Sequence, residues 1–309
     1  MRILLLNPNY ISRPNWGHQL FKNEFSKHHD VTYYGPGYPE YNKSLSVKQI
    51  LKKLKKEFDI ILLYESKYSR CFHGLEEITD IPKILIQIDY ALGLPDYKGF
   101  AKTETINKLI RGNKIDLIFA TSTSNVSALR KNLNMDKVFF LPFSVDINLY
   151  KNMNLKRTID VMAVFNVHKH AYPTRRIVQN KIRKMKINSF TTRIIHKSYI
   201  KKINESKIFV INNNINKRLS MKYTETMACG TFVLADKPED FEIQGFIDGQ
   251  NIVLYDNVKD MEEKVNYYLT HTDERLRISK NGMNFVRKHH SCAIRVKQFT
   301  KIIKREFDI

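Results

Sequence analysis

Short apolar runs alternate along the chain with segments in which apolar residues recur every three or four positions. In the first half, runs typical of buried strands are 2–6, 31–34, 60–64, 84–88, 117–120 and 138–141. Helical spacing is clearest over residues 46–58, where Val47, Ile50 and Leu54 share one face, and it returns at 103–110 and 125–133. Such alternation predicts parallel strands covered by helices on both faces of a sheet.

The same alternation restarts after residues 142–157, a segment of turn formers and charges that interrupts it. Strands are expected at 160–165, 193–195, 208–211, 232–235 and 252–255. Helices are expected around 177–185, over 198–205 and in two stretches near the C-terminus. At 309 residues the chain has room for two domains. We therefore predict an α/β protein of two Rossmann-like, doubly wound parallel-sheet domains.

The chain is strongly basic, with 52 Lys and Arg against 31 Asp and Glu and a net charge of +21. A positive field of this size attracts nucleic acid, an anionic membrane surface or phosphorylated small molecules. A Lys-rich solvated surface would give the same total. The charge alone therefore selects no partner.

Cysteine usage and apolar length both favour a cytoplasmic protein. The three cysteines, Cys71, Cys229 and Cys292, show no CxxC spacing, so we expect free thiols in a reducing compartment. The apolar run near the N-terminus is too short for a signal peptide, and no later run approaches the length of a membrane span. The sequence also lacks the GxGxxG, P-loop, GxSxG and HExxH patterns of dehydrogenases, NTPases, hydrolases and zinc proteases.

The segment 220–234, SMKYTETMACGTFVL, has a layout that suits a nucleotide. It reads as a short helix that carries Glu225, followed by a buried strand, with Gly230 as the residue that ends the helix. A helix N-terminus offers unpaired N–H groups and a positive dipole end to a diphosphate. An ionised carboxylate can accept hydrogen bonds from both hydroxyls of a ribose.

With these two halves, the sequence resembles the GT-B glycosyltransferases of the glycosyltransferase group 1 type (family 4-like), and in particular the CgeB and YkvP spore-protein-like branch. The matching segments are LPFSVD, DVMAVFN followed by YPTRR, INESKIFVIN, SMKYTETMACGTFVLAD and the tail from NIVLYDNVKD to VRKHHS. The resemblance covers most of residues 158–305. It implies two domains facing a cleft, at 1–145 and 158–290, with a linker at 146–157 and a terminal helix at 291–309 that returns to the first domain.

The resemblance also implies a nucleotide-sugar-dependent hexosyltransferase that retains anomeric configuration. Glu225 falls on the ribose-binding carboxylate of the family. The other donor-side positions are Ser220, Lys222, Tyr223, Thr224, Arg175, Arg176 and Asn166. Two residues depart from the family pattern: Lys217 replaces a Glu that contacts the donor sugar, and Asn166 replaces a Gly after the first strand of the second domain.

Sugar transfer from a nucleotide sugar builds negative charge on the departing diphosphate, so the site needs positive groups there. No two Asp residues of the chain form a DxD pair. Lys222, Arg175, Arg176 and the helix end are the substitutes, which predicts an enzyme without a metal or another cofactor. The co-substrate is then a nucleoside-diphosphate sugar of UDP or GDP type.

The first domain is expected to bind the acceptor. An inverting enzyme needs a base near the acceptor hydroxyl, for which Asp89 and His18 are the candidates, whereas a retaining enzyme needs none. An acceptor platform is expected at Asn9, Tyr10, Trp16 and Gly17. The acceptor itself stays open among a glycan, a lipid-linked molecule and a protein.

Two alternatives stay open beside glycosyl transfer. The basic surface would serve a nucleic-acid-binding or DNA-modifying protein, although aromatic residues do not alternate with its lysines and arginines. Lys217 would also be consistent with a non-catalytic, nucleotide-binding relative. A basic chain without a membrane span could in addition contact the inner face of an anionic membrane.

Overall fold

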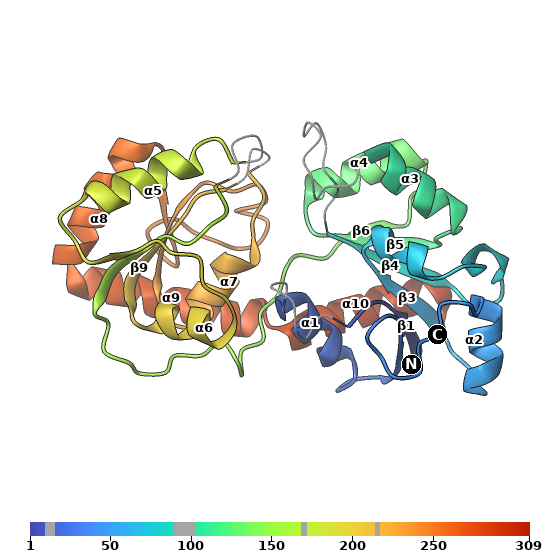
Figure 1. Cartoon of the computed structure of the whole chain (residues 1–309). Helices are drawn as coiled ribbons and strands as arrows, with labels where there is room; N and C mark the ends of the chain where they lie inside the picture. The colour runs from blue at the N-terminus through green and yellow to red at the C-terminus, as the bar shows by residue number, and fades with distance from the viewer. Residues whose placement is uncertain (10–15, 89, 91–102, 168–171, 214–216) are drawn as a thin grey trace. The chain divides into compact units, whose positions relative to one another are not determined.

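The structure, a computed structural model, describes residues 1–9, 16–88, 90, 103–167, 172–213 and 217–309, with the backbone alone at 16–18. Contacts divide the chain into two compact units (Figure 1). Met1–Pro142 and Arg295–Ile309 form the first unit, and Phe143–Ile294 forms the second.

The sheet of the first unit has six parallel strands in the order β2-β1-β3-β4-β5-β6. Its strands are β1 (Arg2–Leu6), β2 (Asp30–Tyr34), β3 (Ile60–Tyr64), β4 (Lys83–Gln87), β5 (Leu117–Ala120) and β6 (Val138–Phe140). All residues of β3, β4 and β5 are buried. Burial on both faces explains why these strands appear in the sequence as unbroken apolar runs.

Helices cover both faces of this sheet. They are α1 (Trp16–Phe25), α2 (Val47–Leu54), α3 (Thr103–Gly112), α4 (Thr123–Leu133) and α10 (Cys292–Phe307), with short 3-10 helices η1 (Ser66–Cys71) and η2 (Leu75–Glu77). Val47, Ile106 and Leu129 share one core with Leu63 of the sheet. Phe299 of α10 lies with its ring centroid 4.9 Å from those of Phe25 and Phe119. The first unit therefore uses the end of the chain to cover its sheet.

Helix α2 is shorter than its apolar pattern predicts. It begins with a capping box in which Ser46 and Gln49 each accept a hydrogen bond from the backbone N–H of the other. It ends at Leu54 because Lys55 has the left-handed conformation (φ 48°, ψ 40°). Phe58 is buried without being helical.

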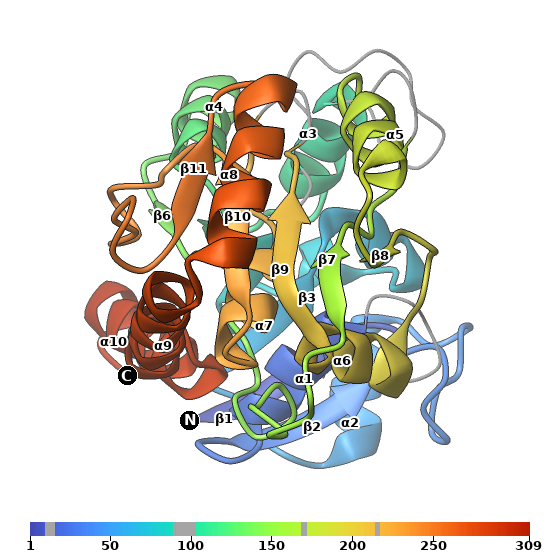
Figure 2. The same ribbon diagram turned by 90° about the vertical axis from the view of Figure 1, so that its left-hand side faces the viewer.

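The sheet of the second unit has five parallel strands in the order β11-β10-β9-β7-β8. The strands are β7 (Ile159–Met162), β8 (Ser189–Phe190), β9 (Ser206–Ile211), β10 (Phe232–Asp236) and β11 (Val253–Tyr255). The helices are α5 (Arg175–Lys184), α6 (His196–Asn204), α7 (Met221–Ala228), α8 (Val258–Thr270) and α9 (Thr272–His289). Figures 1 and 2 show α5 and α8 on one side of this sheet and α6 and α7 on the other. The prediction of two doubly wound parallel sheets is confirmed.

The predicted strand at 193–195 is wrong. The edge strand of the second sheet is β8, two residues long, which pairs with Val161 and Met162 of β7. Asp160 Oδ2 accepts a hydrogen bond from the N–H of Asn188 at 2.9 Å, just before β8, and fixes the strand there. Its length conceals it in the sequence, since two half-buried residues, Ser189 and Phe190, leave no apolar run.

Both sheets have the same strand order. Numbered within each unit, the first five strands run 2-1-3-4-5, so that the order reverses between β1 and β3 and between β7 and β9. In open parallel sheets ligands bind outside the carboxyl ends of the strands at such a reversal. Each unit therefore has one edge at which a ligand site is expected.

Candidate functional site

Helix α7 follows β9 and begins at the carboxyl edge of the second sheet. Its N-cap residue, Ser220, has extended backbone (φ −107°, ψ 163°) and makes no capping hydrogen bond with its side chain. The first N–H groups of a helix have no partner within it, and the helix dipole places positive potential there. The start of α7 is therefore suited to an anion.

The other end of α7 is closed. Gly230 has φ +68°, its N–H donates to the Met227 carbonyl at 2.8 Å, and the Thr231 N–H donates to the Thr226 carbonyl at 3.3 Å. These two hydrogen bonds form a Schellman motif, and Gly230 is the C′ residue, as predicted.

Arg157 holds the carboxyl end of α7 against the rest of the second unit. Its guanidinium donates to the carbonyls of Gly230 (2.8 Å) and Cys229 (3.2 Å) and to the carbonyl of Ser206 (2.5 Å) at the start of β9. It also donates to Thr231 Oγ1 at 2.6 Å. One side chain therefore fixes α7 relative to β9 and β10.

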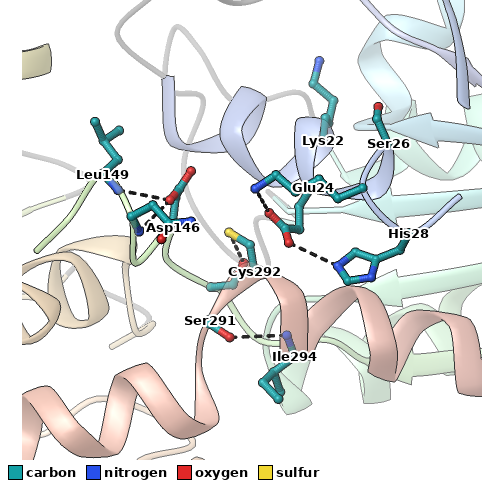
Figure 3. A network of polar contacts seen from close by, with 12 residues as sticks. Lys22, Glu24, Ser26, His28, Asp146, Leu149, Ser291, Cys292 and Ile294 are labelled. Carbon is teal, nitrogen blue, oxygen red and sulfur yellow. Dashed lines mark hydrogen bonds and ion pairs between the residues drawn. The ribbon is translucent and has the colours of Figure 1, made fainter.

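Glu225 lies one turn into α7 and is only 7% exposed. Burial raises the pKa of its carboxyl, while Lys222, Tyr150 and Tyr199 oppose the rise. Tyr150 is placed by a turn in which its N–H donates to the Asp146 carbonyl at 2.8 Å. Asp146 Oδ1 also accepts from the N–H of Leu149 at 3.1 Å (Figure 3). The carboxyl thus sits between two tyrosines and a lysine.

Lys222 is partly exposed and forms no hydrogen bond or ion pair with any residue of the described ranges. Burial, and to a smaller extent Arg175, lower the pKa of its ammonium group to about 8, while Glu225 opposes the decrease. Because Arg175 and Glu225 both act on the pKa of Lys222, the three predicted side chains lie near one another. An anionic ligand would stabilise the charged form of this lysine.

Arg175 opens α5 and is buried. Its Nε donates to the Asn212 carbonyl at 2.7 Å, and its Nη1 donates to the Asn166 carbonyl at 3.2 Å. The guanidinium carbon lies 3.8 Å from the centroid of the Tyr172 ring. Burial lowers the pKa of Arg175. The arginine therefore ties the segment after β7 to the segment after β9, at the reversal of strand order.

Asp236, at the end of β10, is a residue of this edge that the sequence analysis missed. Asp236 Oδ1 accepts from the Asn213 N–H at 2.8 Å, and Oδ2 accepts from Asn212 Nδ2 at 3.3 Å. Burial raises the pKa of its carboxyl to about 6. The sequence offered one signal for Asp236, namely its position at the carboxyl end of a buried strand. Asn212 and Asn213 occupy the equivalent position after β9.

The remaining predicted donor-side residues either make internal hydrogen bonds or have exposed side chains. Thr224 Oγ1 donates to the Met221 carbonyl at 3.1 Å, and the Tyr223 hydroxyl donates to Asn213 Oδ1 at 2.9 Å. Arg176 and Asn166 are exposed. Lys217 is exposed as well, with a positive φ of 51°.

Of the residues predicted for the acceptor side and for the catalytic base, Asn9 is the one whose side chain lies within the described part of the chain. Tyr10 and Asp89 lie outside the described residues, and Trp16, Gly17 and His18 are described only as backbone at the start of α1. Asn9 donates its N–H to the Pro36 carbonyl at 2.9 Å.

The described residues contain neither a metal-binding cluster nor a membrane-spanning helix. Within them, no three His, Cys, Asp or Glu side chains gather as a metal site would require. None of their helices combines the length and the apolar character needed to cross a membrane.

The second half of the chain is similar to a known protein family. Residues 154–301 match the family described as glycosyl transferase-like. No curated protein sequence matches the chain.

Solved structures match the chain over almost its whole length. HepE of Anabaena, solved with UDP, has a TM-score of 0.73 at 14% identity and covers 99% of this chain and 100% of its own. Sucrose-phosphate synthase of Thermosynechococcus elongatus has a TM-score of 0.70 at 11% identity, with 100% of both chains covered. An alpha-glucosyltransferase solved with UDP-glucose and DNA containing an abasic site has a TM-score of 0.66 at 15% identity, covering 98% and 100%. The chain thus has the GT-B-like fold of these glycosyltransferase structures, as predicted.

Proposed function

We propose that this chain is a glycosyltransferase whose second unit binds a nucleoside-diphosphate sugar. The observation that carries the proposal is the grouping of Glu225, Lys222 and Arg175 at the carboxyl edge of the second sheet, beside the open start of α7. The match of residues 154–301 to the glycosyl transferase-like family supports it.

In this proposal each group has a separate task. The carboxylate of Glu225 accepts hydrogen bonds from the two ribose hydroxyls. Lys222 and the first N–H groups of α7 bind the diphosphate, where negative charge grows as the sugar departs. Arg175 acts mainly by holding the segments after β7 and β9 in place, because its Nε and Nη1 donate to the Asn212 and Asn166 carbonyls.

A uridine nucleotide is the first choice of donor, because structures of HepE with UDP and with UDP-glucose match this fold. A hexose is the corresponding choice of sugar. Retention of anomeric configuration and independence from metal stay predictions of the sequence analysis. NMR of the product anomer and assays in chelator test them.

A thermal-shift panel of UDP, GDP, ADP and dTDP sugars tests donor binding. A ligand that binds the folded state alone stabilises it by ~2.7 kcal/mol at a concentration of about 100 times its dissociation constant. We expect one nucleotide to raise the melting temperature, and Glu225→Ala to abolish the rise. A well-folded protein that responds to none of them would contradict the proposal.

The acceptor class is decided by a second experiment. The net charge of +21 and the DNA-bound structural neighbour favour nucleic acid as a second candidate acceptor or partner. Retardation of labelled DNA at physiological salt, weakening steeply as salt increases, would support that candidate. Binding to vesicles of anionic lipid would instead support a lipid-linked acceptor at a membrane surface.

The presence of Lys217 in place of the family's Glu motivates a test of whether the protein is catalytic at all. If UDP-glucose binds but is neither hydrolysed nor transferred, the protein is a non-catalytic, nucleotide-binding relative of the glycosyltransferases. Lys217→Glu would then restore the acid found in the wider family, and any activity it gains would locate the defect.

A further inference from the structure

The carboxyl edge of the first sheet carries a polar network that the donor site does not use. It joins the ends of β1, β3 and β4, which are neighbouring strands (Figure 1). The strand order reverses between β1 and β3, so this is the edge of the first sheet at which a ligand is expected.

The end of β1 is held by a buried lysine and an asparagine. Lys22 Nζ donates to Asn7 Oδ1 at 2.9 Å and to the Pro8 carbonyl at 3.0 Å. Asn7 Nδ2 donates in turn to the Tyr64 carbonyl at 2.5 Å, at the end of β3. These contacts keep the two strand ends in a fixed relation.

The next two residues on the edge are Glu65 and Gln87, both buried. The Ser66 N–H donates to Gln87 Oε1 at 3.0 Å, which turns the amide nitrogen of Gln87 toward the carboxylate. Gln87 Nε2 then donates to Glu65 Oε2 at 3.3 Å, and Lys67 Nζ lies 3.8 Å from the same oxygen. A carboxylate is thus held in a set orientation at the end of β3.

Glu65 has an uncommon backbone conformation, with φ 69° and ψ 115°. A side chain other than glycine at positive φ is strained, and such strain gathers at functional sites, where the surrounding structure maintains it. The hydrogen bonds of its neighbours Ser66 and Gln87 maintain it here.

Ser66, next to Glu65, provides an independent sign of a ligand. It is 3% exposed, and its Oγ has no hydrogen-bond partner within the part of the chain that the structure describes. A buried hydroxyl without a partner is costly and uncommon in native proteins, and a bound ligand is one way to satisfy it.

We propose that Glu65 and Ser66 form a subsite for hydroxyl groups of a neutral sugar at the carboxyl edge of the first sheet. Glu65 accepts a hydrogen bond from one ligand hydroxyl, and Ser66 Oγ donates to an oxygen of the ligand. A phosphate is disfavoured because it would face the Glu65 carboxylate. Identifying this sugar as the acceptor rests on the proposed function.

The test is a ligand-observed NMR titration of the full chain, saturated with UDP, with methyl glycosides of glucose, galactose and mannose and with the matching sugar phosphates. We expect a neutral glycoside to bind. Glu65→Gln should weaken it by at least about 10-fold and Ser66→Ala by about 5-fold, as loss of a charged and of a neutral hydrogen bond would do. The exposed Glu76→Gln and Ser127→Ala serve as matched controls and should bind as the wild type does.

Three outcomes would overturn the subsite: no neutral glycoside binds, the phosphates bind more tightly, or both variants bind as well as the wild type. Ser66→Ala decides the matter alone if Glu65→Gln does not fold. UDP binding is measured in the same samples and should be unchanged by both variants. If the wild type does not bind UDP, the proposed function is contradicted. The glycoside titration then decides the subsite independently.

Discussion

The carboxyl edges of the two sheets have the same strand order, yet a lysine plays a different role at each. In the first unit Lys22 is fully buried and donates to oxygens of Asn7 and Pro8. In the second unit Lys222 is partly exposed and forms no hydrogen bond or ion pair with the described residues. Burial lowers the pKa of both, to about 7 and about 8.

The contrast shows that strand order places a ligand edge but does not decide its chemistry. At the first edge the Glu65 carboxylate is held by the Gln87 amide and lies near the Lys67 ammonium, while the Lys22 ammonium is already bound to protein oxygens. At the second edge, the Lys222 ammonium group lies near the start of α7 and has no hydrogen-bond partner among the described residues. We therefore expect a neutral, hydroxyl-bearing ligand at the first and an anionic one at the second.

Removing the Arg157 side chain should have the largest effect, and it should destabilise the second unit without affecting the first. Arg157→Met leaves three backbone carbonyls without their donor, and at ~1 kcal/mol for each hydrogen bond we expect a loss of about 3 kcal/mol in the second unit. Hydrogen exchange should accelerate in α7, β9 and β10 and not in β1 or β3. The exposed Arg193→Met is the control. Equal acceleration in both units would refute the proposed role of Arg157.

Lys22 predicts how stability depends on pH in the first unit. Its folded pKa, about 7, lies below the ordinary value of 10.5, so folding disfavours the charged form. The loss of stability caused by burying the charged lysine is complete below pH 7 and disappears as the pH rises toward 10.5. This group alone makes the unfolding free energy rise by at most ~1.4 kcal/mol per pH unit in that window. Urea unfolding of wild type and Lys22→Met at pH 7 and 9 measures it, and parallel pH responses would disprove the assignment.

Lys222 predicts how ligand binding depends on pH in the second unit. In the proposed donor site the charged form of Lys222 binds the diphosphate, and this form is lost as the pH rises through about 8. Between pH 7 and 9 we expect UDP affinity to fall by up to ~10-fold, the change for one pH unit beyond a pKa. Lys222→Arg stays charged and should remove the dependence. If calorimetry shows the same fall in this variant, another group titrates.

The smallest effect expected comes from a pair of glycines, one in each unit. Gly230→Ala forces a side chain into the left-handed region at the end of α7 and should cost ~1–2 kcal/mol. Gly112→Ala, where an added Cβ meets nothing within 4 Å, should be neutral or stabilise α3. Thermal melts compare the two, and equal shifts would show that the Schellman motif does not matter.

Much of the architecture could be predicted from the sequence, because buried parallel strands leave unbroken apolar runs. The edge strand β8 could not, since it is only two residues long and its place depends on the hydrogen bond between Asp160 and Asn188. The end of α2 at Lys55 depends on a left-handed residue that no apolar period reveals.

The candidate site was predictable in part. Glu225, Lys222 and Arg175 were predicted from their motifs, and the structure brings the three side chains near one another. Asp236 and Tyr150 were missed because their roles come from contacts with residues distant in the sequence. Helical spacing likewise could not show that Thr224 and Tyr223 would make internal hydrogen bonds.

The most direct test of the account is whether Glu225 recognises the ribose hydroxyls. Calorimetry compares UDP with its dideoxyribose analogue on the wild type and on Glu225→Ala. We predict that the wild type loses at least ~10-fold in affinity for the analogue, since each hydrogen bond to a charged group contributes ~1.5–3 kcal/mol, whereas Glu225→Ala binds both nucleotides equally weakly. If the variant still distinguishes the two nucleotides as the wild type does, Glu225 is not the ribose-binding residue.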